Sequence, residues 1–353
     1  MTLLNKLKKL EKEGLITLRE DDSGELFIAN YRPCVQYDNL WTPLLKQCRG
    51  LVIDKEGRKI INSFPKFWNL SEHKLEEIPN ESVKIFEKLD GSWIGIYRNR
   101  KNNSLSCTTR GSFSSDQAIL ATILLNNKYK NYLNKFNLDN YTYMFEFIGP
   151  SDKTGNFLVI NYSEVKLVLL AIRDTITGRY QDISSFCWPD KVKKYDGIKD
   201  YNSLVGIERE NKEGYVIRFK SGFMIKIKHA DYIRLHRIIT GVSNKSIWEY
   251  LKTGQSFDDI LDRVPDEFMS FVKKTKEDLE GKYDYIWNSV VWNYQENIDR
   301  FKNKSRKDFA EWAKTQNYTS LLFMMLDDIS LNDHIWKIIK PDYEKPFIGE
   351  IEK

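Results

Sequence analysis

The stretch that decides the fold is VKIFEKLDGSWIGIYRNRKNNSLSCTTR, residues 83–110. Short apolar runs such as Val83–Phe86 alternate with polar, turn-like segments, which is typical of β-strands joined by tight turns. The polar tip Asn99–Ser104 predicts the turn of a hairpin. The same texture occurs before this stretch, in residues 24–64, and after it, in residues 141–227.

Upstream, Leu51–Ile53 and Lys59–Ile61 flank the loop Asp54–Gly57 and predict another hairpin. Strand-like runs return downstream at Tyr141–Ile148, Leu158–Tyr162, Val165–Ile172, Gly214–Phe219 and Phe223–Ile227. Helical spacing of apolar residues is confined to Met1–Ile16 and Ser115–Asn134 in this part of the chain. Strands joined by short turns, with few long helices, favour antiparallel sheets in an α+β domain over a βαβ repeat.

From about Val242 the strand pattern gives way to helical spacing. The helical segments are Ser246–Thr253, Phe257–Arg263, Asp266–Val291, which Asp266 can cap, and Lys307–Thr315. We therefore predict an N-terminal antiparallel-sheet domain at residues 1–241 and a smaller all-helical domain at residues 242–353.

The composition says more about the partners and the cellular location of the protein than about its activity. The net charge of +5, from 55 basic and 50 acidic residues, permits a nucleic-acid partner only if the basic residues cluster. No apolar run approaches the roughly 18 residues of a membrane span, so we expect no membrane contact. The four cysteines form no C-x-x-C pair, which argues against a zinc site or a disulfide framework and fits a cytoplasmic location.

Lys88, Asp90 and Gly91 form the first candidate site. A strand-end lysine beside an Asp-Gly turn is a common structural pattern, and taken alone that interpretation is preferred. The functional hypothesis is a nucleophilic lysine, because an amine attacks in its neutral form, which burial or nearby cations favour.

Two glutamates stand at the edge of, or inside, apolar strands. Glu146 lies within YMFEFI, where an unpaired carboxylate is costly without a cation, a metal or a hydrogen-bonding partner. Glu213 opens the apolar run Gly214–Phe219 and, taken alone, is better explained as a turn residue. Together the two carboxylates are candidate ligands for Mg²⁺, which is often held by one or two carboxylates and phosphates.

Lys226 and Lys228 alternate with Ile225 and Ile227, so a period of two places both lysines on one face of a strand. A solvated basic face is the common outcome of this pattern. The alternative is a pair of cations directed at phosphates. The nearby His229 and His236 match no strong metal-binding spacing.

These blocks, in this order, resemble the covalent nucleotidyltransferases, and finer features resemble the phage T4 RNA ligase 1 family. The finer features are QCRGL (47–51), FPKFWNL (64–70), RGS followed by SDQA (110–118), VKLVLLAIR (165–173), and IKIK (225–228) followed by Tyr232 and His236. The resemblance covers roughly residues 25–240 and implies the antiparallel nucleotidyltransferase fold.

Carried over by position, the resemblance assigns a role to each motif residue. Lys88 would be adenylated by ATP, and Arg110 would hold the ribose or the RNA end. Glu146 and Glu213 would bind metal, Mg²⁺ or Mn²⁺, or the ribose hydroxyls, and we add Asp90 as a third metal candidate. Gly91 would allow close backbone approach to the nucleotide. Contacts with ATP or AMP are implied for the cations Arg49, Lys66, Lys226 and Lys228 and for the aromatic residues Trp68, Tyr232 and Tyr31.

The resemblance implies an ATP-dependent RNA ligase that joins 5′-phosphate and 3′-hydroxyl RNA ends. We expect it to act as a monomer on single-stranded RNA or broken stem-loops, in tRNA repair or in general end joining. The alternatives are a DNA ligase or capping-type enzyme and a non-catalytic nucleic-acid-binding protein on the same fold. The basic run Arg300–Lys307 is either a solvated surface or a phosphate-binding patch of an RNA-specificity domain.

Overall fold

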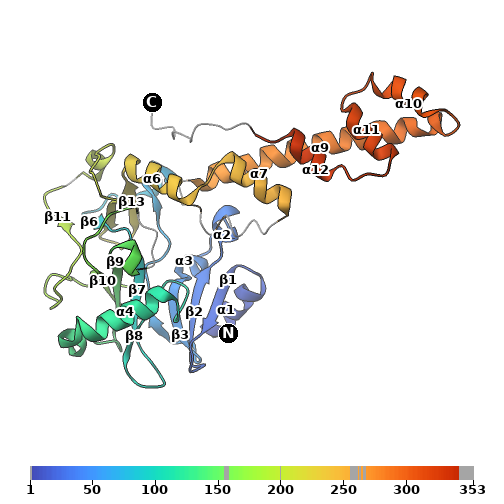
Figure 1. Cartoon of the computed structure of the whole chain (residues 1–353). Helices are drawn as coiled ribbons and strands as arrows, with labels where there is room; N and C mark the ends of the chain where they lie inside the picture. Colours follow the sequence, from blue (N-terminus) through green and yellow to red (C-terminus); the bar gives the residue numbers. More distant parts are fainter. Residues whose placement is uncertain are drawn as a thin grey trace. The chain divides into compact units, whose positions relative to one another are not determined.

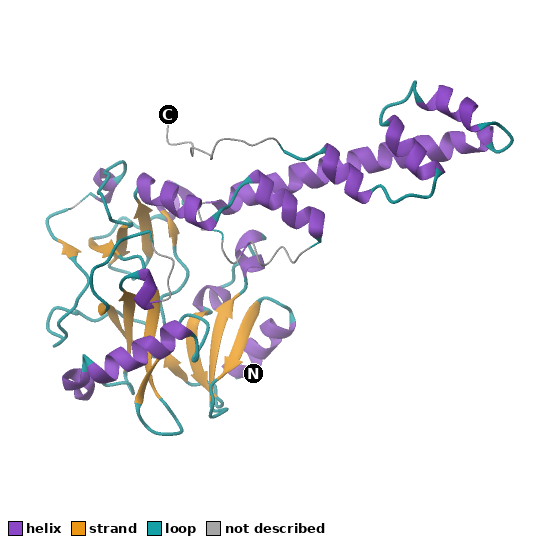
Figure 2. Ribbon diagram, in the orientation of Figure 1, coloured by secondary structure: helices purple, strands orange, loops and turns teal. Residues whose placement is uncertain are grey.

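The computed structural model describes residues 2–154, 159–198, 200–254, 261, 264 and 268–341. The chain divides into two compact units, Met1–Ile239 and Thr240–Lys353. The first unit contains antiparallel sheets and the second is helical (Figures 1 and 2). The predicted α+β class, with a sheet-rich part followed by a helical part, is confirmed.

The first unit opens with helix α1 (Leu3–Lys12), whose buried Leu4 and Leu7 pack against the first sheet. This sheet has the order β1-β2-β3-β4 and is antiparallel throughout. Its strands are β1 (Ile16–Glu20), β2 (Leu26–Tyr31), β3 (Arg49–Asp54) and β4 (Lys59–Ile61), and the short helices α2 (Pro33–Tyr37) and α3 (Pro43–Gln47) join β2 to β3. The hairpin predicted around Asp54–Gly57 is the β3–β4 pair.

Two further sheets complete this unit, with strand orders β10-β9-β7-β8 and β11-β6-β12-β13-β5. All their pairings are antiparallel except the parallel pair β13–β5. The second sheet contains β7 (Ser92–Arg98), β8 (Leu105–Thr108), β9 (Tyr141–Ile148) and β10 (Lys166–Asp174). The third contains β5 (Trp68–Asn69), β6 (Val83–Lys88), β11 (Lys194–Tyr195), β12 (Gly214–Phe219) and β13 (Met224–Lys228).

The largest core of the first unit joins the second and third sheets to helix α4 (Asp116–Asn127), which packs on the second sheet (Figure 2). Phe86 of β6, Leu125 of α4 and Phe145 of β9 are among its buried members. The predicted helix Ser115–Asn134 is therefore shorter than expected. It ends at Asn127, before the buried ring of Tyr129 stacks on Trp188 at 4.4 Å.

One predicted strand is wrong. The described part of Leu158–Tyr162, residues 159–162, forms no strand. The backbone amides of this segment donate to side chains and not to a neighbouring strand. Val159 and Ile160 donate to the carboxylate of Asp90, and Asn161 donates to the side-chain oxygen of Asn211. The remaining short elements of this unit are α5 (Ser151–Thr154), η1 (Leu70–Glu72), η2 (Leu75–Glu77), η3 (Lys130–Lys135) and η4 (Tyr201–Leu204), and helix α6 (Ala230–Thr240) ends at the boundary between the units.

The second unit is built on the long helix α9 (Met269–Ile298) and has its own core. Around it lie α7 (Asn244–Thr253), η6 (Asp299–Phe301), α10 (Arg306–Ala313), α11 (Thr319–Leu326) and α12 (Asn332–Ile338). Helix α9 continues past the predicted end at Val291, because Tyr294 and Ile298 also face the core. Apart from Leu261, the predicted helix Phe257–Arg263 and the predicted cap Asp266 lie outside the described residues.

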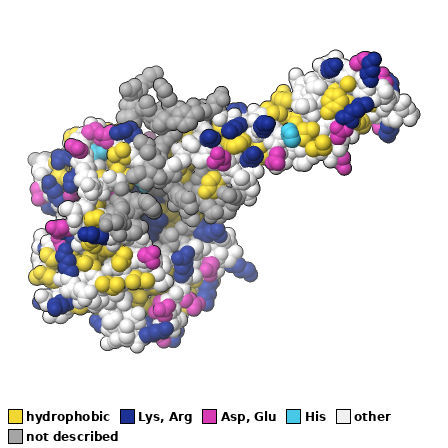
Figure 3. All heavy atoms as spheres, in the orientation of Figure 1, with side chains coloured by type: hydrophobic (Ala, Val, Ile, Leu, Met, Phe, Trp, Pro, Cys, Tyr) yellow, Lys and Arg dark blue, Asp and Glu magenta, His cyan; other side chains and the backbone are white. Residues whose placement is uncertain are grey.

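Two surface properties bear on partners. Among the described residues, no helix has the length and apolarity needed to cross a membrane. On the face seen in Figure 3, Lys and Arg side chains are interspersed with Asp and Glu side chains in both units. The view therefore shows mixed charge rather than a uniformly basic face.

Candidate active site

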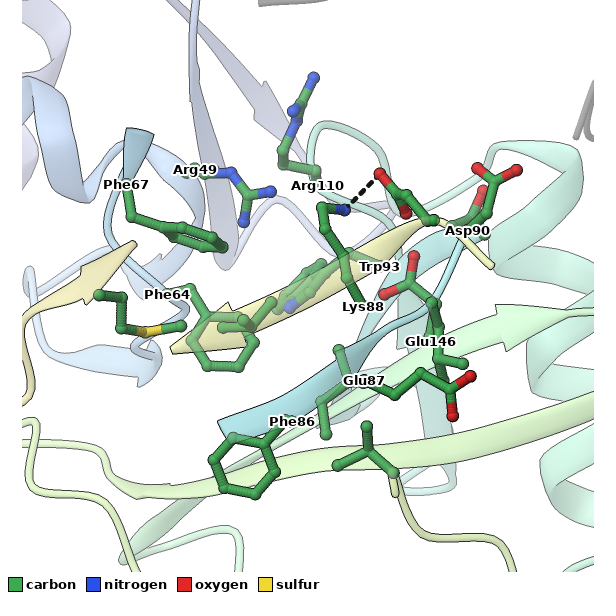
Figure 4. Close-up of a pocket in the computed structure, with 18 of the residues that line it drawn as sticks. Arg49, Phe64, Phe67, Phe86, Glu87, Lys88, Asp90, Trp93, Arg110 and Glu146 are labelled. Carbon is green, nitrogen blue, oxygen red and sulfur yellow. Dashed lines mark ion pairs between the residues drawn. The ribbon is translucent and has the colours of Figure 1, made fainter. Parts of the chain in front are cut away.

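A cavity of about 630 Å³ opens in the first unit where the ends of β6, β12 and β13 meet. In the strand register, Gly214 at the start of β12 pairs with Lys88 at the end of β6 and with Lys228 at the end of β13. Polar side chains from β3, β9 and the segment after β8 complete its wall (Figure 4). The sheet register alone thus brings together residues that are 140 positions apart in the sequence.

Lys88 and Lys228 share one carboxylate, that of Glu213. The Nζ atom of Lys88 lies 2.7 Å from Oε1 of Glu213, and the Nζ atom of Lys228 lies 3.5 Å from the same oxygen. Burial alone would raise the pKa of Glu213, but Lys88 and Lys228 reverse that effect and hold its pKa below the ordinary value. The side chain of Lys88 is 21% exposed, so its amine can be reached from the cavity.

Glu146 lies on β9, at the side of Lys88 away from the phenylalanine side chains (Figure 4). Burial, together with the nearby Glu213 and Asp90, raises the pKa of Glu146 to about 8, although Lys88 and Arg49 act in the opposite direction. No hydrogen bond or ion pair to this carboxyl group is formed within the described part of the chain. A half-buried carboxyl group of this kind favours a cationic ligand.

Asp90, the third predicted metal candidate, already accepts hydrogen bonds at both carboxylate oxygens. Its Oδ1 accepts a hydrogen bond from the hydroxyl of Tyr232 at 3.0 Å. Its Oδ2 accepts hydrogen bonds from the backbone of Val159 at 2.8 Å and of Ile160 at 3.2 Å. Burial and the charge of Glu213 nevertheless raise the pKa of Asp90. These hydrogen bonds make Asp90 a clamp that holds the 159–162 segment beside Tyr232.

Of the three carboxylates predicted to bind metal, Glu146 and Glu213 are left as the less engaged pair. The structure shows no group of three or more His, Cys, Asp or Glu side chains arranged around a metal, as far as the described residues extend. Glu146 and the partly engaged Glu213 still fit a magnesium ion, because Mg²⁺ typically keeps several waters and takes one or two protein carboxylates plus substrate phosphates.

Two arginines predicted to contact nucleotide also line the cavity. The guanidinium of Arg49 on β3 lies 5.7 Å from the ring centroid of Phe67. The guanidinium of Arg110, just after β8, lies 5.7 Å from the ring centroid of Tyr31. Together with Lys88 and Lys228, they make one side of the cavity strongly cationic (Figure 4).

Lys66, Trp68 and Tyr31 do not line this cavity. The buried ammonium of Lys66 donates a hydrogen bond to Oε1 of Gln36 at 2.8 Å and lies 5.6–5.9 Å from the ring centroids of Tyr31, Trp41 and Trp68. Lys226, also predicted to contact nucleotide, is buried on β13 and likewise lies outside the cavity lining. The geometry assigns the first three residues to an aromatic cluster beside the site.

Gly91 has a structural explanation that the sequence did not supply. A Cβ atom at this position would lie 2.6 Å from the carbonyl oxygen of Phe147 and 2.9 Å from Cγ of Glu146. The chain crosses from the third sheet to the second between Lys88 and Ser92, so β7 must start against the backbone of β9. Any larger side chain would displace the strand that holds Glu146.

Sequence reasoning also missed residues that form the cavity. Phe64, Phe67, Phe86, Val216 and Met224 line one end of it, and Trp93 and Arg218 line it as well. Apolar side chains in strands carry no signal that separates a cavity wall from a core. Arg218 did carry one, because it interrupts the apolar strand GYVIRF just as Glu146 interrupts YMFEFI.

A family model described as RNA ligase matches residues 47–232, which is more than half of the chain. A protein assigned as a bifunctional polynucleotide kinase/RNA ligase in Autographa californica nuclear polyhedrosis virus is 24% identical over 287 residues. A protein assigned as an RNA ligase in Thermovibrio ammonificans is 29% identical over 264 residues, and an RNA ligase of Rhodothermus phage RM378 is 20% identical over 402.

The coverage of these relatives differs. The viral match covers 73% of this chain and 40% of the relative, the bacterial match 69% and 66%, and the phage match 91% and 89%. The chain thus spans less than two thirds of the length of the first two relatives. The segment matched by the family model contains Lys88, Glu146, Glu213 and Lys228, and the resemblance drawn from the sequence motifs is confirmed: this protein belongs to the RNA ligase family.

Proposed function

We propose that this protein is an ATP-dependent RNA ligase that joins a 5′-phosphate RNA end to a 3′-hydroxyl RNA end, with Lys88 as its nucleophile. The observation that carries the proposal is the position of Lys88. Its partly exposed amine enters a cavity that is large enough for a nucleotide, in contact with Glu213 and beside Lys228 and Arg49. The family model covers this whole arrangement.

The proposed reaction has three phosphoryl transfers. In the first, the neutral amine of Lys88 attacks the α-phosphorus of ATP, the bond to pyrophosphate breaks, and the amine loses a proton as the N–P bond forms. In the second, an oxygen of the RNA 5′-phosphate attacks the same phosphorus, the N–P bond to Lys88 breaks, and the departing amine of Lys88 regains its proton. In the third, the RNA 3′-hydroxyl attacks the activated 5′-phosphate, AMP leaves, and the hydroxyl proton is released.

Each residue of the cavity has a role in holding these groups. Glu213 orients the amine of Lys88, and Lys228, Arg49 and Arg110 supply positive charge for phosphate oxygens. Glu146, with Glu213, would hold a magnesium or manganese ion, which when bound would neutralise charge on the phosphate oxygens. Asp90 would keep the 159–162 segment and Tyr232 beside the lysine.

The helical unit is proposed to select the RNA. Its basic run Arg300–Lys307 is partly neutralised within the unit, because Arg306 makes two hydrogen bonds to Asp327 and Lys302 pairs with Asp299 at 2.7 Å. Broken stem-loops and unstructured single strands both remain candidate substrates. Ligation assays that compare the two will decide between repair of a structured RNA and general end joining.

The test of the proposed function uses ATP labelled at the α-phosphate, with magnesium, followed by denaturing gel electrophoresis. The wild-type protein should retain label, and Lys88→Ala should lose it by at least about a hundredfold, since a covalent nucleophile is removed. Lys84→Ala is the matched control, because Lys84 is an exposed lysine on the same strand. An unlabelled wild type, or a labelled Lys88→Ala, would refute the assignment. Nicked DNA in place of RNA tests the acceptor.

A further inference from the structure

Arg218 is a buried cation whose side chain the proposed chemistry does not use. It lies on β12, two residues after Val216, and lines the cavity. Only 8% of the residue is exposed. Its guanidinium lies over two aromatic rings, 4.7 Å from the centroid of Phe86 and 4.4 Å from that of Tyr180.

The hydrogen-bond donors of Arg218 have no acceptor within the described part of the chain. Asp182 and Tyr180 act electrostatically on Arg218 without a hydrogen bond to it, and Asp182 itself accepts hydrogen bonds from Ser184. Burial lowers the pKa of Arg218, yet an arginine keeps its charge and its five donors in a protein. Arg218 lines the cavity, so donors of its guanidinium that open on the cavity favour a ligand that supplies acceptors.

The cavity has two chemically different ends, and Arg218 belongs to the apolar one. Figure 4 shows Glu146 and Asp90 on one side of Lys88 and Phe64, Phe67 and Phe86 on the other. Within that apolar end, Met224 pairs with Arg218 in the strand register.

The distance along the strand fits a nucleotide. Lys88 pairs with Gly214, and Arg218 lies four residues further along β12, about 13 Å away at the rise of an extended strand. This is comparable to the span from the α-phosphate of a nucleotide to the far edge of its base. A phosphate at Lys88 would therefore place a flat, largely apolar base between the aromatic side chains.

We propose that Arg218 reads the base of the nucleotide donor, by donating hydrogen bonds to a ring nitrogen of the adenine whose α-phosphate lies at Lys88. The inference rests on the proposed function, and makes Arg218 a specificity-determining residue. Adenine offers the acceptors N1, N3 and N7 at its edges. The contacts with the rings of Phe86 and Tyr180 restrain the guanidinium, so little flexibility is lost when the hydrogen bond forms.

The experiment measures equilibrium binding of ATP and of its 1-deaza, 3-deaza and 7-deaza analogues to the full chain. Lys88→Ala is the background, so that no transfer takes place during the titration. Arg218→Met keeps most of the packing volume, and Arg218→Lys keeps the charge without the planar donors. Lys84→Met is the matched control, since Lys84 pairs with Arg218 in the strand register but is exposed.

A hydrogen bond from a charged donor is expected to change affinity roughly ten- to a hundredfold. The protein with Arg218 should therefore bind one deaza analogue that much more weakly than ATP. Arg218→Met should bind ATP more weakly by a similar factor and should no longer distinguish ATP from that analogue. Arg218→Lys should recover only part of the loss, and Lys84→Met should behave as the background does.

Three results would overturn the inference. Arg218→Met could bind ATP and all three analogues as the background does, with or without a lower melting temperature, which leaves Arg218 a purely structural role. It could weaken binding of inorganic tripolyphosphate as much as that of ATP, which makes Arg218 a phosphate ligand. Finally, if the chain with Lys88 intact takes up no label and the background binds no ATP, the proposed function fails and the inference with it.

Discussion

The raised pKa of the Glu146 carboxyl group predicts how the stability of the protein depends on pH. Its pKa in the folded protein is raised to about 8 from an ordinary value of 4.5, so the folded state keeps a proton that the unfolded state releases. The stability associated with the neutral carboxyl group is therefore complete below the lower value and is lost as the pH rises through the upper one. Glu146→Gln, which is always neutral, should escape this loss. Its free energy of unfolding relative to wild type should rise between these pH values, by at most about 1.4 kcal/mol per pH unit.

Urea denaturation of both proteins at a series of pH values checks this expectation, with the exposed Glu76→Gln as the control. Parallel stability curves for wild type and Glu146→Gln would show that Glu146 titrates normally.

A divalent cation at Glu146 must displace the proton, so magnesium affinity should increase with pH over the same range. Glu146→Gln should lose that dependence, as isothermal titration at several pH values can measure.

The sequence allowed us to predict site residues that lie at the ends of strands. It did not allow us to predict side chains whose position depends on residues far away in the chain. Lys88, Glu213 and Lys228 each lie at a strand end in the sequence pattern, and the register of β6, β12 and β13 brings them together. Alternation along a strand shows which side chains share a face, but not which sheet covers that face. The separation of Lys66 from the cavity and the burial of Arg218 inside it could therefore not be predicted.

At the scale of elements, the segment 159–162 is the clearest departure from the sequence pattern. Its apolar residues suggested a strand, yet its amides bind Asp90 and Asn211, which are 50 or more positions away in the chain. Asn211 also donates a side-chain hydrogen bond to the carbonyl of Asn161, and the hydroxyl of Tyr162 accepts one from the amide of Asp90. The segment is thus held by side chains from two other parts of the chain, and a local pattern cannot reveal such partners.

We predict that Asp90→Ala releases this segment. Two partly buried hydrogen bonds from backbone amides to the Asp90 carboxylate are lost, so the amides of Val159 and Ile160 should exchange with solvent roughly ten- to a hundredfold faster. Hydrogen exchange followed by mass spectrometry of peptides covering residues 159–162 measures the effect. Adenylation of Lys88 should fall in the same variant, because Tyr232 loses its acceptor at Oδ1.

Two further variants separate the contributions to the clamp. Tyr232→Phe removes the hydroxyl contact and leaves both backbone bonds of Asp90 in place, so exchange of Val159 and Ile160 should stay as in wild type. Asn211→Ala should accelerate exchange of Asn161 more than that of Val159 and Ile160. Unchanged exchange in Asp90→Ala would mean that the segment is held by other contacts and that Asp90 acts only on the reacting groups.

At the scale of the whole molecule, each unit has the internal contacts of an independent folding unit. The helical unit has its own core around Ile286, Phe309 and Leu322. It is also fastened internally by a hydrogen bond of 2.8 Å from Nε1 of Trp248 to the carbonyl of Trp336. Units with separate cores generally fold alone. The change from strands to helices near Val242 could be predicted from the sequence, because it follows from the spacing of apolar residues along the chain. That spacing can be read without knowing which residues are in contact in the fold.

The last prediction follows from where the cavity residues lie. All of them fall between Asn30 and His236, within the first unit. A protein ending at residue 241 should therefore fold and take up label from ATP at a rate within about threefold of the full chain. RNA joining by this fragment should fall at least about tenfold, because the proposed RNA-selecting unit and its Arg300–Lys307 run are gone.

The measurements are the rate of protein labelling and the rate of RNA joining, with pre-adenylated RNA as a third substrate that bypasses the lysine. A soluble fragment that labels normally but joins neither RNA supports an RNA role for the helical unit. A folded fragment that joins RNA as well as the full chain would remove that role. A folded fragment that fails to take up label would instead show that the helical unit contributes to adenylation of Lys88, and the division of labour between the two units would have to be redrawn.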